Sequence, residues 1–238
     1  MQEAGSGSRT LILLPGTLGT VDIFHRQLAA FSGSCRVLVL GYPGVSSAEA
    51  MTASFLQLLE QLGVRSAHFA GSSLGAYWLH VFLREQPRLA RSVLLANTFL
   101  DPARLRFIRM FDPAYLDSVT PTQLKEAWLA FARELPQAEL REFLVDAVGN
   151  EQSAEELAGR CRTIATAGRV EPLDLPPGLV RILSCADDRV IAPDTAQEVA
   201  AAYPGAQHVR LATGGHYPHL LSATEYNRLI EANLLDHP

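Results

Sequence analysis

Short apolar runs alternate with longer helical patterns along most of the chain, and this alternation constrains the fold more than any other feature. Several runs are apolar throughout, as expected for strands buried on both faces of a parallel sheet. The predicted strands are residues 10–14, 36–40, 66–70, 92–96, 179–184 and 208–211. The predicted helices are residues 21–31, 47–62, 75–85, 195–202 and 223–235. Repeated strand–helix–strand units predict an α/β fold with a mostly parallel sheet and flanking helices.

The alternation stops between residues 97 and 179, where helical patterns occur without a convincing strand. The expected helices there are residues 121–133, 137–148 and 153–166, separated by turn signals. The interval is too long for a loop. We therefore expect a helical cap, residues 98–178, inserted into a core made of residues 1–97 and 179–238.

Composition excludes several classes of function. The net charge of −5 gives no indication of a basic surface that would bind nucleic acid or an anionic membrane. No apolar stretch is long enough to span a bilayer. Cys35, Cys161 and Cys185 are widely spaced, so we expect free thiols rather than a disulfide framework or a metal site. The polar N-terminus lacks the pattern of a signal peptide, which predicts a cytoplasmic protein. The sequence indicates no particular oligomeric state.

The strongest chemical motif is Gly71-Ser72-Ser73-Leu74-Gly75, which lies between a predicted strand and a predicted helix. This is the strand–turn–helix context of a nucleophile elbow, in which the middle serine projects its hydroxyl from a strained turn. The two glycines keep side chains out of the close approach of strand and helix. Only Ser73 has glycines on both sides at the required distance, so we predict that Ser73 is a nucleophile.

A serine nucleophile needs a base and an acid that orients the base. His216 follows the last predicted strand in a loop shaped by two glycines and a proline, and it is the predicted base; His219 is the reserve. The acid is expected after the preceding strand, where Asp187 and Asp188 are both candidates.

An acyl-transfer site also needs backbone amides that stabilise an oxyanion. The amide of Leu74 lies at the start of the predicted helix, where the helix dipole favours negative charge. The loop after the first predicted strand can supply a second amide, from Thr17 in preference to Leu18. This loop lacks the spacing of a phosphate-binding motif, and no metal or organic cofactor is implied.

Together these motifs resemble the α/β-hydrolase superfamily over nearly the whole chain apart from the cap. In the acid loop of that family the aspartate follows a glycine by three residues; Cys185 occupies the glycine position, so the resemblance selects Asp188. The chain begins at the first central strand of the family without the usual leading hairpin. The resemblance therefore implies an α/β-hydrolase fold with about six strands, of which residues 10–14 form the first.

Within the superfamily the chain is most similar to the maspardin-like group. The matching segments are residues 11–16, 19–27, 92–99, 170–172, 203–206 and 213–218. Like this group, the chain has Pro15-Gly16 where many hydrolases have His-Gly. The maspardin-like pattern lacks the histidine of the last loop and belongs to proteins regarded as non-enzymatic binding proteins, whereas this chain has His216 there.

These features predict a serine hydrolase that cleaves a carboxylic ester or thioester through an acyl-enzyme on Ser73. The expected partner is a small acyl substrate with an apolar part. Apolar cap residues and two residues after the elbow suggest its pocket, although most aromatic residues at helical spacing belong to a core. The pocket candidates are Tyr77, Trp78, Phe107, Phe111 and Trp128, beside Ile108, Met110, Tyr115 and Phe131. The alternatives are acyl transfer, cyclisation or lyase chemistry by the same triad, and a non-enzymatic adaptor.

Overall fold

The computed structural model describes residues 1–42 and 47–237 and contains a seven-stranded sheet in the order β1-β3-β2-β4-β5-β6-β7. The strands are β1 (Gln2–Ala4), β2 (Arg9–Leu14), β3 (Cys35–Val39), β4 (Ala67–Ser72), β5 (Ala90–Ala96), β6 (Val180–Cys185) and β7 (Gln207–Leu211). All neighbouring strands from β3 to β7 are parallel. The predicted α/β-hydrolase fold with a mostly parallel sheet is confirmed.

The sheet has one strand more than the six expected. Strand β1 pairs antiparallel with β3 at the edge of the sheet, with Glu3 opposite Leu38. An edge strand of this length makes backbone hydrogen bonds on one side only and buries little surface. Its three residues therefore need no apolar run, and the sequence carries no hydrophobic signal for this strand. Residues 10–14, predicted as the first strand, correspond to β2.

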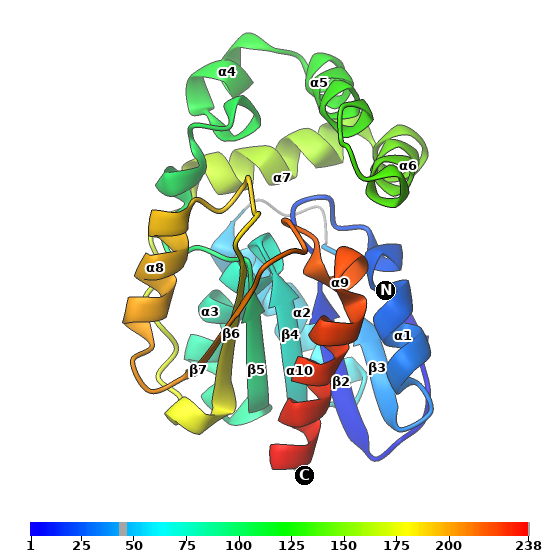
Figure 1. The fold of residues 1–238 in the computed structure, drawn as a ribbon, viewed down its shortest axis with the longest axis vertical. Coiled ribbons are helices and arrows are strands. Elements are labelled where there is room, and N and C mark those ends of the chain that lie inside the picture. The colour runs from blue at the N-terminus through cyan, green and yellow to red at the C-terminus, as the bar shows by residue number, and fades with distance from the viewer. Residues whose placement is uncertain (43–46, 238) are drawn as a thin grey trace.

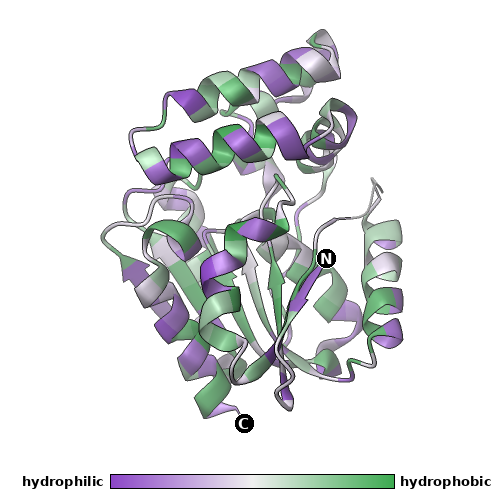
Figure 2. Ribbon diagram, turned by 90° about the vertical axis from the view of Figure 1, so that its right-hand side faces the viewer, coloured by the Kyte–Doolittle hydropathy of each residue, from purple (hydrophilic) through white to green (hydrophobic). Residues whose placement is uncertain are grey.

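Helices cover both faces of the sheet, with α1 and α10 on one face and α2 and α3 on the other (Figure 1). The helices of this core are α1 (His25–Phe31), α2 (Ala48–Gln61), α3 (Leu74–Glu85), α8 (Pro193–Ala202), α9 (Pro218–Leu221) and α10 (Ala223–Asp236). Short 3-10 helices occur at Val21–Phe24, Pro87–Leu89 and Pro177–Leu179. The central strands are the most deeply buried part of the chain; Ile12, Leu13 and Leu14 have no exposed surface. Figure 2 shows these strands as mostly hydrophobic, while the surrounding helices alternate between hydrophobic and hydrophilic residues.

Between β5 and β6 the described chain is mostly helical, and its helices lie beyond the carboxyl ends of the strands (Figure 1). Its helices are α4 (Pro113–Ser118), α5 (Pro121–Arg133), α6 (Ala138–Asp146) and α7 (Ala154–Thr166), with 3-10 turns at Pro102–Leu105 and Arg109–Phe111 and a π-helical turn at Ala147–Glu151. Local signals fix these boundaries. Thr120 forms a capping box with Gln123 ahead of Pro121, and the Ser153 hydroxyl accepts a hydrogen bond from the amide of Glu156 at 3.1 Å.

Gly75 is required by the contact between α3 and the end of β2. A Cβ atom at this position would lie 2.2 Å from the carbonyl oxygen of Leu14 and 2.6 Å from that of Pro15. Both atoms belong to the backbone, so the clash cannot be relieved by a change of rotamer. The α3 helix can therefore lie this close to the carboxyl end of β2 only with glycine here.

We expect Gly75→Ala to lower the free energy of unfolding by about 3 kcal/mol, because overpacking against backbone moves a helix or a strand. The matched control is Gly159→Ala in α7, where an added Cβ meets no atom within 4 Å. That change should stabilise the protein by up to about 1 kcal/mol, because alanine is the better helix former. Urea unfolding of both variants tests the prediction, and equal stabilities would contradict it.

Candidate active site

Ser73 occupies a strained turn between β4 and α3, with φ 54° and ψ −120°. A positive φ is rare for serine and persists only where the surroundings hold it. The amide of Ser73 donates to the carbonyl oxygen of Ala96 at 2.9 Å, and its own carbonyl accepts from the hydroxyl of Thr98 at 3.1 Å. Strand β5 and the residues after it therefore hold the turn in place.

The glycines of the motif allow this turn to form. A Cβ on Gly71 would lie 2.6 Å from the amide nitrogen of Ala76, so the end of the strand and the first turn of α3 leave no room for a side chain here. Ser73 is the residue before the helix, and Leu74 is the first residue in it. The amide of Leu74 thus has no partner from within the helix, as is usual for a first turn.

Asp188 and His216 are joined by a hydrogen bond of 3.0 Å between Oδ2 and Nδ1. The other carboxylate oxygen of Asp188 accepts from the amides of Val190 and Ile191, at 2.7 and 3.0 Å. The Asp188 side chain is only 2% exposed, and that of His216 is 11% exposed. Three hydrogen bonds thus fix the carboxylate, and it fixes which way the imidazole faces.

Asp187, the other candidate acid, contacts the backbone of the histidine loop instead. Its carboxylate accepts from the amides of Gly214 and Gly215, at 3.3 and 2.8 Å. The side-chain amide of Asn97 donates to the carbonyl oxygen of Gly215 at 2.6 Å. Asn97 itself has a positive φ of 43° at the end of β5. Sequence reasoning did not find these two supporting roles, because both depend on which loops meet in space.

The loop after β2 lies directly against the nucleophile elbow. A Cβ on Gly16 would sit 3.4 Å from Cβ of Ser73 and 3.9 Å from its Oγ. The carbonyl oxygen of Gly16 accepts from the amide of Gly19 at 3.0 Å, which closes a turn with Thr17 and Leu18 at its centre. Thr17 is 7% exposed and faces the same cavity as Ser73. The loop that was predicted to supply an oxyanion donor is thus adjacent to the hydroxyl of Ser73.

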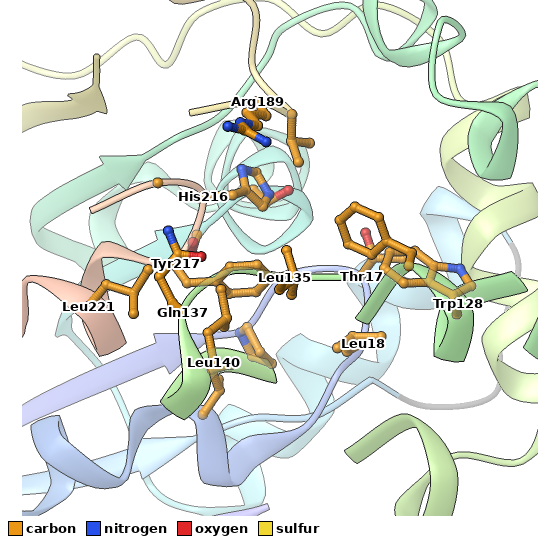
Figure 3. A pocket seen from close by; sticks show the side chains of 18 of the residues that line it. Thr17, Leu18, Trp128, Leu135, Gln137, Leu140, Arg189, His216, Tyr217 and Leu221 are labelled. Atoms are coloured by element: carbon orange, nitrogen blue, oxygen red, sulfur yellow. The ribbon is translucent and has the colours of Figure 1, made fainter. Parts of the chain in front are cut away.

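A cavity of about 400 Å³ opens above Ser73, His216 and Thr17, between the strand ends and the helical segment above them. Most of its lining is apolar, and an aromatic series forms one wall. The Phe111 and Trp128 rings lie 6.0 Å apart, and Trp128 and Phe131 lie 5.9 Å apart. Figure 3 shows His216 next to Arg189, with Thr17, Leu18 and Trp128 on one side and Leu140, Tyr217 and Leu221 on the other. No hydrogen bond joins Ser73 to His216 among the described residues; such bonds often tighten only when substrate binds.

The predicted pocket residues divide into two groups. Phe111 and Trp128 line the cavity, as do Ile108, Met110 and Phe131. The prediction was wrong for four others, of which Tyr115 packs against the Arg109 guanidinium outside the cavity lining. Tyr77 and Trp78 are buried behind the elbow, where Tyr77 stacks on Phe99 and donates its hydroxyl to the carbonyl of Gly168 at 2.9 Å. Phe107 is 63% exposed and lies outside the cavity lining.

His219, the reserve base, is a buried packing residue. Its ring lies 4.7 Å from that of Phe24 and 5.7 Å from that of Tyr226. Neither ring nitrogen has a hydrogen-bond partner within the described part of the chain. Burial, and then the nearby His216, lower the pKa of His219 to about 3. His219 is therefore neutral near pH 7 and lacks the carboxylate partner that His216 has.

Buried histidines should make the protein sensitive to acid. Burial lowers the pKa of His80 to about 4 and that of His219 to about 3, from 6.5 in an unfolded chain. Below pH 6.5 the unfolded state binds more protons than the folded state. The contribution of these two histidines to the free energy of unfolding is therefore fully present above pH 6.5, and it is lost as the pH drops toward 4 and then 3. Each group contributes a slope of at most about 1.4 kcal/mol per pH unit. Urea unfolding at pH 7 and pH 5 should show a smaller acid loss in His219→Phe than in wild type; equal losses would contradict the assignment.

No helix in residues 1–42 and 47–237 is both long and apolar enough to cross a bilayer. No group of three or more His, Cys, Asp or Glu side chains in them is arranged to hold a metal ion. The three cysteines are free and buried.

Comparisons with known proteins agree with this fold. The family described as "Alpha/beta hydrolase family" matches residues 11–229. Human maspardin is 29% identical over 233 residues, covering 94% of this chain and 74% of maspardin. An enol-lactonase from Burkholderia xenovorans superposes with a TM-score of 0.79 at 21% identity, covering 98% of this chain and 95% of the lactonase. A thermophilic esterase from Thermogutta terrifontis superposes with a TM-score of 0.77 at 20% identity, covering 100% of this chain and 93% of the esterase. The chain belongs to the α/β-hydrolase family, and within it the chain is close to the maspardins.

Proposed function

We propose that the protein is a serine hydrolase that cleaves a carboxylic ester or thioester. The observation that carries this proposal is the Asp188–His216 hydrogen bond at a cavity that Ser73 also lines from a strained elbow. A histidine oriented by a buried carboxylate is suited to remove a proton from a serine hydroxyl. Membership of the α/β-hydrolase family adds to it, because its structural neighbours include a lactonase and an esterase.

In the proposed mechanism Ser73 Oγ attacks the carbonyl carbon while His216 takes its proton. Asp188 holds the imidazole in the tautomer that leaves Nε2 free and stabilises the imidazolium that forms. The amides of Leu74 and Thr17 donate to the oxyanion. The proton on His216 passes to the leaving alcohol or thiol, and the acyl group stays on Ser73. Water, deprotonated by His216, then releases the acid and restores the serine.

The cavity indicates a substrate with a substantial apolar part. Its volume of about 400 Å³ and its wall of Phe111, Trp128 and Phe131 suit an acyl chain or ring rather than a sugar or a peptide backbone. We propose that residues 98–178 act as the cap that supplies this wall, on a core of residues 1–97 and 179–238. The three buried, free cysteines support a reducing, cytoplasmic compartment.

Turnover of p-nitrophenyl esters and acyl thioesters of increasing chain length tests the proposal. We expect saturable hydrolysis that improves with acyl length until the cavity is filled. Turnover that appears only when an alcohol or amine acceptor is added would replace hydrolysis with acyl transfer. If folded protein binds such compounds but converts none of them, the non-enzymatic binding role suggested by the maspardin resemblance takes the place of this proposal.

A further inference from the structure

Arg160 links the helical segment between β5 and β6 to the loop that faces Ser73. It lies on α7, which passes above the carboxyl ends of the strands (Figure 1). Its Nε donates to the carbonyl oxygen of Thr17 at 2.8 Å. Its stem and Nε also pack against Gly19, since a Cβ on Gly19 would lie 3.5 Å from Nε and 3.6 Å from Cδ. A side chain 143 positions away in the sequence therefore determines where this peptide group points.

Two neighbours of Arg160 hold the same loop at its ends. Gln152 accepts a hydrogen bond from Nη2 of Arg160 and donates to the hydroxyl of Thr20 at 3.0 Å. The Tyr42 hydroxyl donates to the carbonyl oxygen of Pro15. Residues 15–20 are thus fixed at three points, and Arg160 occupies the central one.

No acidic side chain of the described residues is in direct contact with the guanidinium of Arg160. No carboxylate in residues 1–42 or 47–237 forms an ion pair with its guanidinium, and its donors go to a carbonyl and an amide oxygen. Burial lowers the pKa of Arg160, and the charge of Glu156, one turn earlier on α7 and not in contact with the guanidinium, opposes that effect. A partly buried guanidinium with no carboxylate in direct contact is costly to keep in a fold. Such a charge is useful next to a place where negative charge develops.

The hydrogen bonds of the loop also strengthen its amides as donors. A hydrogen bond to a carbonyl polarises the peptide group and makes its N–H a better donor. The bond from Gly19 to the Gly16 carbonyl acts in this way on the amide of Thr17. The bond from Arg160 to the Thr17 carbonyl acts on the amide of Leu18. Both candidate oxyanion donors therefore lie in peptide groups whose oxygens are already bound.

We propose that Arg160 is a positioning residue of the oxyanion hole, which orients the loop at Thr17 and polarises the amide of Leu18 from helix α7. The inference rests on the proposed hydrolase function and adds that α7 takes part in transition-state stabilisation. Because the oxyanion exists only after attack, the loss of Arg160 affects kcat and leaves ground-state binding nearly unchanged.

The test compares Arg160→Met, Arg160→Lys and Arg160→Ala with wild type on the best ester substrate. Removing one oxyanion donor costs roughly 100- to 1000-fold, so an indirect effect of roughly 10- to 100-fold on kcat is expected for Arg160→Met, with KM within about threefold. Arg160→Lys keeps a charged donor and should recover part of that loss. Added methylguanidinium should partly restore kcat in Arg160→Ala, where the side chain leaves space for it.

Arg162→Met is the matched control on the same helix. Arg162 is exposed and binds Asp117 at 2.8 Å and the carbonyl of Leu116 at 2.7 Å, away from the loop. It should keep the kcat of wild type, and all variants should unfold at similar temperatures. An Arg160→Met kcat equal to that of Arg162→Met, or a loss that neither lysine nor methylguanidinium restores, overturns this inference while wild-type turnover stands. Absence of turnover by wild type overturns the hydrolase proposal and this inference with it.

Discussion

Ser73→Ala is expected to lower kcat by roughly 10⁶-fold, the loss found when a nucleophilic serine is removed from a working triad. The physical reason is that no acyl-enzyme can form, while the cavity walls and the loop at Thr17 are unchanged. The affinity for substrate should therefore remain close to that of wild type. Steady-state kinetics gives the first quantity, and calorimetric titration of the inactive variant with a slowly cleaved ester gives the second.

Ser72→Ala is the control for this experiment, because Ser72 is the neighbouring serine and also lines the cavity. Ser72 lies at the end of β4 with ordinary strand geometry, whereas Ser73 has the positive φ of the elbow. Ser72→Ala should keep kcat within about tenfold of wild type. Loss of activity in Ser72→Ala with retention in Ser73→Ala would show that the elbow has been assigned to the wrong residue.

Asp188→Asn is expected to lower kcat by roughly 10⁴-fold, because an amide favours the wrong tautomer of the histidine and cannot stabilise an imidazolium. Asp188 Oδ2 lies 3.0 Å from Nδ1 of His216, and its Oδ1 is held by the amides of Val190 and Ile191. An asparagine preserves the size of the side chain and removes its charge. Kinetics on the ester used for Ser73→Ala measures the loss.

The variant Asp187→Asn distinguishes the roles of the two adjacent aspartates. Asp187 accepts from the amides of Gly214 and Gly215, and an asparagine oxygen can still accept one of these hydrogen bonds. We expect a loss of about tenfold or less, since His216 would keep its own partner. Equal losses in the two variants would contradict the assignment of Asp188 as the acid that orients His216.

Sequence patterns predicted those features that local physics determines. The six longer strands are confirmed; most of them contain a short apolar run, whereas β7 alternates polar residues with Val209 and Leu211. Helices α5 and α7 follow caps that are visible at Thr120 and Ser153. The elbow was predictable because its close packing requires glycine, which is visible in the sequence. At Gly75, for example, a Cβ would lie 2.2 Å from the carbonyl oxygen of Leu14. The choice between Asp187 and Asp188 came from resemblance, and in the structure it is Asp188 that contacts His216.

The features that sequence reasoning missed depend on contacts between distant segments. Tyr77 and Trp78 follow the elbow closely in sequence, but the helix carries their side chains away from the cavity. Phe107 is aromatic like Phe111, yet Phe107 is exposed, whereas Phe111 lies at the end of a 3-10 turn and is buried in the wall of the cavity. The bond from Arg160 to Thr17 joins residues whose proximity no local pattern encodes.

The central claim is that Ser73 is an activated nucleophile, and labelling with a fluorophosphonate followed by intact-mass and peptide analysis tests it most directly. We predict one adduct on the peptide that contains Ser73, no adduct in Ser73→Ala and much slower labelling in His216→Ala. Folded wild-type protein that stays unlabelled over hours with both a small and a large probe, or that is labelled on another residue, would contradict the claim.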